Sequence, residues 1–434
     1  MSEIFEIAYA AATNRLCFFT GTGFSKAVTN NGAPSWQGLL ESLCDLLPDA
    51  DELKKSLFPG DKPSPLSLEE IAQVISIKLT TENKSIHEET AKLIKAIEIG
   101  EDNEQVAKFF SERQFRVVTT NYDKLAEELT GESECQSLAP GLPIPRSSAN
   151  VKVYHVHGSI DSPDNMVITS EDYFKFINGD SYFSRKLSTV LHENTVIILG
   201  YSLGDTNLKA IISDYKGFSK THVIGSNIFL ISRSGVDQHV KDYYSHCYGI
   251  RVLDNLDIPD FFSELNEKTP KVESIAQRSI DSIRNVVYKG YHFKEAYLKL
   301  EDSFYRIVSA LSAEGLSLDD ERVVAVIGDV IDVKRELTTE NNAWEQYEQL
   351  ARWLIYLGTI LEIKGTSIEK VYLKAVLRSM NTMSNRLIIG CSWHAYKAWK
   401  HRWSSVMASN RALIKKHVEE KTSDGDALSV VNSI

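Results

Sequence analysis

The stretch Leu16–Ser25 has the sequence LCFFTGTGFS, an apolar run that ends in two glycines and a serine. An apolar run closed by a Gly-x-Gly turn is typical of a buried strand that delivers its backbone to a ligand, because glycine allows the main chain to approach a phosphate closely. Amide groups at the start of a following helix would then face the anion. From this stretch alone, a phosphate-binding loop and an ordinary tight turn are equally good interpretations.

Short apolar runs recur further along the chain, separated by helical or mixed segments. They lie at residues 115–119, 151–155, 196–200, 228–231 and 249–253. This alternation predicts an α/β fold with a Rossmann-like, mainly parallel sheet whose faces are covered. Between the glycine turn and about residue 113 the periodicity is helical, which predicts an insertion that caps the end of the first strand. Ligands bind such sheets beyond the carboxyl ends of the strands.

Beyond about Pro270 the sequence changes to helical spacing with few glycines and prolines. We therefore expect a first domain over residues 1–268 and an all-helical regulatory or assembly domain over residues 269–434. The segment Trp393–Trp403 mixes aromatic and basic residues, which would permit stacking on bases but favours an amphipathic helix with buried tryptophans. From Thr422 onward we expect a loose tail.

Composition narrows the class of protein. With 434 residues, of which 43% are hydrophobic, the chain can bury a large core in two domains. Its formal net charge of −11 argues against a membrane-surface protein, and direct nucleic-acid binding is not expected. The five cysteines form no C-x-x-C pair, which argues against a disulfide framework or a zinc site. Neither a signal peptide nor a membrane helix is expected, so we predict a cytoplasmic protein.

Four of the expected strand ends carry polar residues suited to chemistry. They are the segments Gly21–Ser25, Thr119–Asp123, His155–Ser159 and Gly200–Asp205. Each has an ordinary structural interpretation: Asn121, Asp123 and Asp205 are good helix caps, and His157 would be a packed turn histidine. Four such ends in succession favour a ligand site instead.

The order Gly-x-Gly-x-Ser, Thr-x-Asn-x-Asp, His-Gly and Gly-x-Ser resembles the NAD-binding domain of sirtuins, over roughly residues 10–255. The family usually has Gly-Ala-Gly in the first motif and glutamine inside the second, where this chain has Thr22 and Thr120. The resemblance implies that NAD is bound as the substrate. The NAD-binding residues that it implies are Gly21, Thr22, Gly23, Ser25, Gly200 and Ser202. Asp205 has no clear counterpart in the family, and a contact with NAD and a helix cap are equally good interpretations of it.

The resemblance also assigns catalytic roles to Asn121, Asp123 and His157. Breaking the bond between nicotinamide and ribose builds positive charge on the sugar, which an oriented amide and a nearby carboxylate can stabilise. Asn121 would hold the attacking water, Asp123 would lie by the nicotinamide ribose, and His157 would act on a ribose hydroxyl.

Zinc-binding cysteines are absent from the expected positions. Sirtuin deacylases carry two C-x-x-C pairs for a structural zinc, whereas residues 136–146 of this chain predict a Pro-rich loop, and no metal is expected. The run Met166–Phe174 resembles a segment of bacterial sirtuin-like defence effectors, in which water replaces the acyl-lysine acceptor.

These observations lead to one main hypothesis and two alternatives. The main hypothesis is an NAD glycohydrolase that acts as a gated effector of antiphage defence by depleting NAD. Such an effector would work as a homo-oligomer, with a companion protein that senses infection, or both. The alternatives are an NAD-dependent deacylase or ADP-ribosyltransferase, and a non-catalytic sensor of NAD or ADP-ribose.

Overall fold

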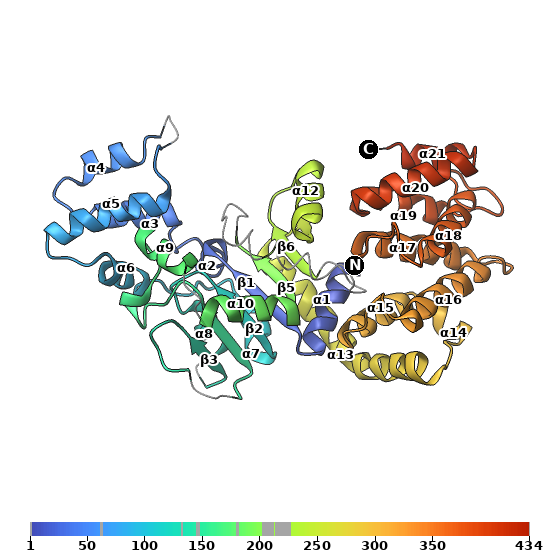
Figure 1. Ribbon diagram of the computed structural model, residues 1–434, viewed down its shortest axis with the longest axis horizontal. Coiled ribbons are helices and arrows are strands. Elements are labelled where there is room, and N and C mark those ends of the chain that lie inside the picture. Colours follow the sequence, from blue (N-terminus) through green and yellow to red (C-terminus); the bar gives the residue numbers. More distant parts are fainter. Residues whose placement is uncertain are drawn as a thin grey trace.

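A parallel sheet lies at the centre of the first part of the chain (Figure 1). The computed structural model describes residues 2–60, 64–131, 133–144, 148–178, 182–201, 212 and 227–433. Within these residues the sheet has seven strands in the order β3-β4-β2-β1-β5-β6-β7, and every neighbouring pair is parallel. The strands are β1 (Leu16–Thr20), β2 (Phe115–Thr119), β3 (Cys135–Leu138), β4 (Val151–His155), β5 (Thr195–Leu199), β6 (Ile228–Ser232) and β7 (Ile250–Asp254).

Strand β1 is buried along its whole length because both faces of the sheet are covered. Alternate side chains point to opposite faces, so Phe18 packs on one face with Phe109 and Phe262, while Phe19 packs on the other with Val190. The helices beside these two faces are α1 (Ser2–Ala12), α2 (Thr22–Val28), α7 (Glu104–Glu112), α8 (Leu125–Thr130), α10 (Tyr182–Glu193), α12 (Gln238–Tyr248) and α13 (Ile258–Lys289). This architecture confirms the predicted α/β class.

The strand order reverses at β1. From β1 the chain continues to β2 on one side, and it later returns to place β5 on the other side. Thr20 pairs with Thr119 of β2 and with Leu199 of β5, so the turns that follow all three strands start at the same level. Such a reversal opens a crevice at the carboxyl edge of the sheet, where ligands bind in open α/β folds.

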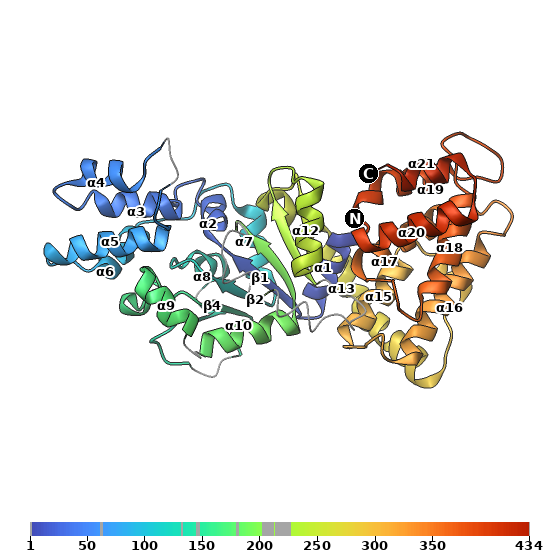
Figure 2. The same ribbon diagram turned by 45° about the horizontal axis from the view of Figure 1, so that its top comes forward.

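A group of helices from the expected insertion stands at this carboxyl edge (Figure 2). These helices are α3 (Trp36–Cys44), α4 (Ala50–Leu57), α5 (Leu68–Thr81) and α6 (Ile86–Lys95), joined later in the chain by η1 (Pro163–Asn165) and α9 (Ser170–Asn178). They share a core of their own, in which Leu43, Ile75 and Ile94 pack with Tyr122 and Ile168 from loops of the sheet. The insertion is therefore fixed to the edge where a ligand would bind.

The named elements in residues 290–433 are all helices, as expected. They are α14 (Glu295–Leu298), α15 (Ser303–Ala313), α16 (Glu321–Leu337), α17 (Trp344–Ile360), α18 (Glu369–Asn381), α19 (Trp393–Arg402), η2 (Trp403–Ser405), α20 (Ala408–Lys421) and α21 (Gly425–Val431). Helix α19 buries Trp399, whose indole nitrogen donates a 3.0 Å hydrogen bond to Ser379 Oγ, so the interpretation as an amphipathic helix is confirmed.

Two local expectations are wrong. The end of the chain is no loose tail, because Asp424 caps α21 through the amide of Ala427 at 2.8 Å and Val430 is buried. The segment 136–146 is not loop throughout, because Gln136 and Leu138 lie in edge strand β3, which pairs with β4. Its strand character was hidden because the residue buried in alternation with Leu138 is a glutamine.

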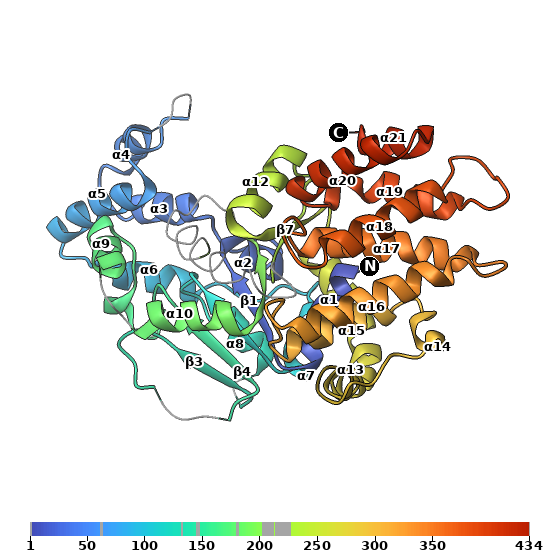
Figure 3. The same cartoon turned by 45° about the vertical axis from the view of Figure 1, so that its right-hand side comes forward.

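Helix α13 runs without interruption through the expected domain boundary between residues 268 and 269, so the division into two domains stays a proposal. Helix α1 lies between the sheet and the C-terminal helices (Figure 3). At this junction the buried Glu6 of α1 pairs with Arg251 of β7 and accepts a 3.0 Å hydrogen bond from Tyr356 of α17. None of the helices in the described residues is long and apolar enough to cross a membrane.

Candidate functional site

A cavity of about 820 Å³ lies in the crevice at the carboxyl edge of the sheet. Its floor is formed by residues that follow β1, β2, β4 and β5, and its outer wall by the insertion and α9. The predicted residues among those that line it are Thr22, Gly23, Ser25, Asn121, Asp123, His157 and Gly200. The fold thus collects residues from four strand ends in one cavity.

The glycine turn after β1 packs directly against the turn after β5. The amide of Gly23 donates to the carbonyl of Gly200 at 2.7 Å, and the amide of Gly21 donates to that of Leu199 at 3.1 Å. Gly200 has a φ of +61°, and a Cβ atom there would lie 1.9 Å from the amide nitrogen of Phe24. Glycine is therefore required at both Gly23 and Gly200. Gly23, which has no side chain, lines the cavity with its main chain.

Gly21 is not among the residues that line the cavity, but it packs closely against Tyr201. A Cβ atom at Gly21 would lie 2.4 Å from Cδ2 of Tyr201, a residue that does line the cavity. The predicted residues Ser202 and Asp205 lie outside the described residues.

Three polar side chains in the cavity form a hydrogen-bonded row. The amide nitrogen of the Asn121 side chain donates to Ser25 Oγ at 2.7 Å, and Ser25 Oγ donates to Asp123 Oδ2 at 2.7 Å. Burial raises the pKa of Asp123, while the hydrogen bond from Ser25 opposes that shift. The other carboxylate oxygen of Asp123 accepts from the amide of Leu125 at 3.2 Å, so Asp123 supports the start of α8 as well.

His157 lies in the same cavity and is nearly buried, with 5% of its surface exposed. Its ring makes edge-to-face contacts with Tyr173 and Phe176 of α9, at centroid distances of 5.4 and 5.1 Å. Its carbonyl accepts a 2.8 Å hydrogen bond from the amide of Val167. The aromatic contacts fix the plane of the His157 ring beside the cavity. His157 is therefore both a packed histidine and a residue that faces a ligand in the cavity.

Sequence reasoning missed the residues that support this row from below. His155, completely buried at the end of β4, contacts Glu127 of α8 and the carbonyl of Asn121. A histidine at a buried strand position, with a glutamate on an apolar face of the preceding helix, would have been a signal for this pair.

Trp36 in the outer wall of the cavity meets Tyr122, from the loop after β2, at a centroid distance of 6.2 Å. The Tyr122 hydroxyl donates to the carbonyl of Val167 at 2.6 Å and so ties the loop after β2 to the loop that precedes α9. Lys26, one turn into α2, adds a cation to the same cavity.

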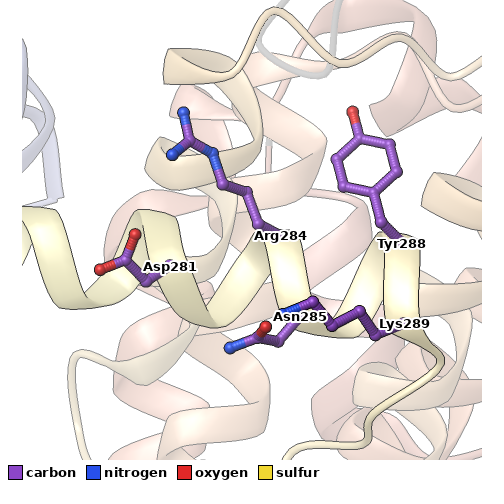
Figure 4. A pocket seen from close by; sticks show the side chains of 5 residues that line it. All are labelled: Asp281, Arg284, Asn285, Tyr288 and Lys289. Atoms are coloured by element: carbon purple, nitrogen blue, oxygen red, sulfur yellow. The ribbon is translucent and has the colours of Figure 1, made fainter.

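A second hollow, of about 430 Å³, differs from the cavity in how it is built. Its lining residues, among them Asp281 and Tyr288, all project from the single helix α13 (Figure 4). Arg284 in this hollow is already paired with Glu314. No cluster of three or more histidine, cysteine or acidic residues in the described part of the chain could hold a metal ion.

Comparison with known proteins identifies the class. Residues 116–253 match the SIR2-like domain, so the chain contains a SIR2-like domain and the resemblance to sirtuins is confirmed. The chain is 28% identical over 256 residues to the NAD(+) hydrolase ThsA of Enterococcus faecium, covering 51% of this chain and 52% of that protein.

Two further relatives extend the comparison. Defense-associated sirtuin 2 of Bacillus subtilis is 20% identical over 59% of this chain and 24% of its own length. The NAD(+) hydrolase ThsA of Cytobacillus dafuensis is 24% identical over 48% of this chain and 39% of its own. The chain is thus a distant homologue of NAD(+) hydrolases and of a defense-associated sirtuin, and it spans about half or less of the length of the relatives it matches.

Proposed function

We propose that this protein is an NAD glycohydrolase, which cleaves NAD to nicotinamide and ADP-ribose. The observation that carries the proposal is the row Asn121–Ser25–Asp123, which shares one cavity with His157. The SIR2-like domain and the NAD(+) hydrolases among the relatives support NAD as the substrate.

The glycine turn would bind the pyrophosphate of NAD. Thr22 and Gly23 line the cavity where the backbone comes closest to a ligand, and Lys26 would balance part of the phosphate charge. A volume of about 820 Å³ lies within the range of small-molecule and cofactor pockets. Gly200 would contact the same part of NAD. Ser202 stays a predicted contact on its adenosine side, and Asp205 stays a predicted NAD contact.

The polar row would carry out the hydrolysis. The reaction breaks the bond between the nicotinamide nitrogen and C1′ of the ribose, joins a water oxygen to C1′, and releases nicotinamide, ADP-ribose and one proton. Asn121 would orient the water, and the Asp123 carboxylate would stabilise positive charge on the ribose as the bond breaks. His157 would bind a ribose hydroxyl and accept its proton.

The biological role that we propose is a gated effector of antiphage defence. An enzyme that consumes NAD harms its own cell, so activity must wait for a signal, and the C-terminal helices are the candidate regulatory part. A homo-oligomer or a companion protein that senses infection would supply that signal. The defence-associated sirtuin among the relatives supports this role.

The test is to incubate the full chain with NAD and follow the products by chromatography, and to measure NAD in infected cells that express it. We expect Asn121→Ala and His157→Ala to lower turnover about 100-fold or more, as expected for loss of a catalytic group. Asn150→Ala and His239→Ala are matched controls, because both side chains are exposed and lie outside the residues that line the cavity.

Each outcome separates the hypotheses. Free ADP-ribose and nicotinamide support the hydrolase, whereas intact NAD in both assays with folded protein overturns it. A deacylated peptide or an ADP-ribosylated protein would replace the hydrolase by a transferase. Binding of NAD without turnover, unchanged in His157→Ala, would indicate a sensor.

A further inference from the structure

His155 is a completely buried histidine directly beneath the loop that carries Asn121. Its Nε2 atom lies 2.7 Å from Oε1 of Glu127, and its Nδ1 atom lies 3.2 Å from the main-chain oxygen of Asn121. Both partners are acceptors, a carboxylate and a carbonyl. A neutral imidazole can donate from one nitrogen only, so the two hydrogen bonds exist together when the ring carries two protons.

The charges around His155 favour that doubly protonated ring. Lys124 Nζ lies 2.9 Å from the same Glu127 oxygen, and 2.6 Å from Asp161 Oδ2. Glu127 therefore faces both Lys124 and His155, and the charges of Glu127, Asp161, Lys124 and His155 sum to zero when His155 is an imidazolium. Burial of Glu127 would raise its pKa, but the two cations outweigh burial and lower it to about 2. Burial would lower the pKa of His155, but Glu127 outweighs it and the pKa is raised.

His155 is connected to the polar row through the main chain of Asn121. His155 Nδ1 hydrogen-bonds the main-chain carbonyl of Asn121. The main-chain amide of Asn121 donates to Thr119 Oγ1 at 3.0 Å. Its side chain then reaches Ser25 in the cavity. The positive charge of His155 also lowers the pKa of Asp123, against the effect of burial.

We propose that His155 is a positioning residue, whose imidazolium, held by Glu127, fixes the peptide of Asn121 so that the Asn121 side chain points into the cavity. His155 does not line that cavity, so it acts through Asn121. The effect on turnover rests on the proposed function, whereas the protonation of the ring does not.

The proposal predicts a loss of turnover on the alkaline side. A raised histidine pKa means that the imidazolium is present at low pH and is lost as pH rises through the raised pKa. Besides Glu127 and Lys124, Asp123 interacts with the charge of the ring, and Cys135 interacts with Glu127 and Lys124. Burial raises the pKa of the Cys135 thiol to about 12, so Cys135 does not titrate in this range.

The first experiment measures the ring directly. The full chain, labelled with ¹⁵N-histidine, is titrated by NMR, and the His155 signal is assigned as the one that changes most in Glu127→Gln. We expect both ring nitrogens of His155 to stay protonated at a pH where an unperturbed histidine is already neutral. A ring that loses its second proton at or below the pH where an unperturbed histidine does would overturn the proposal, whether or not the protein consumes NAD.

The second experiment measures how NAD turnover depends on pH in Glu127→Gln. We expect the alkaline loss of turnover to move down by about one pH unit or more, because the charge that holds the imidazolium is gone. Glu6→Gln is the matched control, since it removes a buried carboxylate paired with a cation at the junction with the C-terminal helices, and the alkaline loss should stay in place. An equal effect of both substitutions on the profile would mean that Glu127 acts through stability alone and would overturn the proposal.

The two experiments keep the two proposals apart. If the ring is doubly protonated and the protein does not hydrolyse NAD, the proposed function fails while the charge state of His155 stands. If NAD is hydrolysed and the ring is neutral, the positioning role fails alone. If Glu127→Gln does not fold, His155→Gln assigns the signal instead, and the titration of the wild-type ring still decides.

Discussion

The amide of Gly23 donates a 2.7 Å hydrogen bond to the carbonyl of Gly200, and this bond joins the turns that follow β1 and β5. A Cβ atom on Gly23 would lie 2.6 Å from the same carbonyl oxygen and 2.7 Å from the Gly200 Cα. Both atoms belong to the main chain, so neither can rotate away. The crevice where the strand order reverses therefore depends on glycine at this position.

We expect Gly23→Ala to lower the free energy of unfolding by about 1–3 kcal/mol, because an added methyl group must push two packed turns apart. NAD binding should weaken at the same time. Gly328→Ala is the control, because Gly328 lies inside α16 with open space around it and should gain about 0.5–1 kcal/mol. Chemical denaturation and isothermal titration measure the two effects. A stable Gly23→Ala protein with normal NAD binding would contradict the close contact.

The row Asn121–Ser25–Asp123 makes a prediction about acid pH. A carboxylate that is needed for turnover is lost as pH falls through its pKa, and the pKa of Asp123 is already raised by burial. Ser25→Ala removes the hydrogen bond that opposes this shift, so turnover should be lost at a higher pH than in the wild type.

The pH dependence of NAD turnover measures this effect, with Ser111→Ala as the control at an exposed position on α7. Asp123→Asn should abolish the acid limb together with most of the turnover. An acid limb that stays at the same pH in Ser25→Ala would mean that another group is responsible for it.

The sequence predicts those parts of the fold that depend on apolar patterning. Buried strands such as β1 and β5 are continuous apolar runs, and their carboxyl ends meet because the strands are parallel, so the cluster of Ser25, Asn121 and His157 follows from the pattern. Edge strand β3 was missed because a glutamine takes one of its two buried positions and no apolar run marks it.

The support beneath the site was harder to predict. The contact between His155 and Glu127 joins residues 28 positions apart, and it exists only because α8 packs against β4. The order of the hydrogen bonds among Asn121, Ser25 and Asp123 was likewise not predictable. It depends on the directions of the side chains, which the spacing of residues in the sequence does not specify. The segment 202–211, with Ser202 and Asp205, lies outside the described residues.

The insertion is anchored to α9 through Asp172, which makes a prediction about stability. His87 Nε2 of α6 lies 3.0 Å from Asp172 Oδ2, which also accepts from the amide of Thr169 at 3.0 Å. The amide of Asp172 donates back to Thr169 Oγ1, so the two residues form a capping box at the start of α9. Burial would raise the pKa of Asp172, but the hydrogen bonds from His87 and Thr169 outweigh it and lower the pKa.

We expect Asp172→Asn to lower the free energy of unfolding by about 1–3 kcal/mol at neutral pH. Because the folded pKa is lowered, this stabilisation is complete above the unfolded pKa of about 4 and is lost as pH falls through the folded pKa. The difference between wild type and variant should therefore shrink in acid, as measured by denaturation at several pH values. Asp164→Asn, on η1, is the control. If the stability difference between wild type and Asp172→Asn stays constant with pH, the substitution acts through altered packing and not through the lost charge.

The last prediction concerns the junction between the sheet and the C-terminal helices. Arg251 and Glu6 form a buried ion pair. The guanidinium carbon of Arg251 lies 4.1 Å from the centroid of the Phe229 ring. Arg251→Met leaves the Glu6 carboxylate buried with Tyr356 as its remaining partner, so we expect a loss of about 3–5 kcal/mol in the free energy of unfolding.

Adding Glu6→Leu to Arg251→Met should restore much of that stability, because no unpaired charge then stays buried. Arg284→Met, which breaks the exposed pair with Glu314, is the control and should cost no more than about 1 kcal/mol. Because Glu6 lies on α1 and α1 leads directly into β1, the same Arg251→Met protein should show faster amide exchange in α1 and in the facing part of α17. A double variant as unstable as the single one would mean that Arg251 stabilises the junction through its packing on Phe229 and not through its charge.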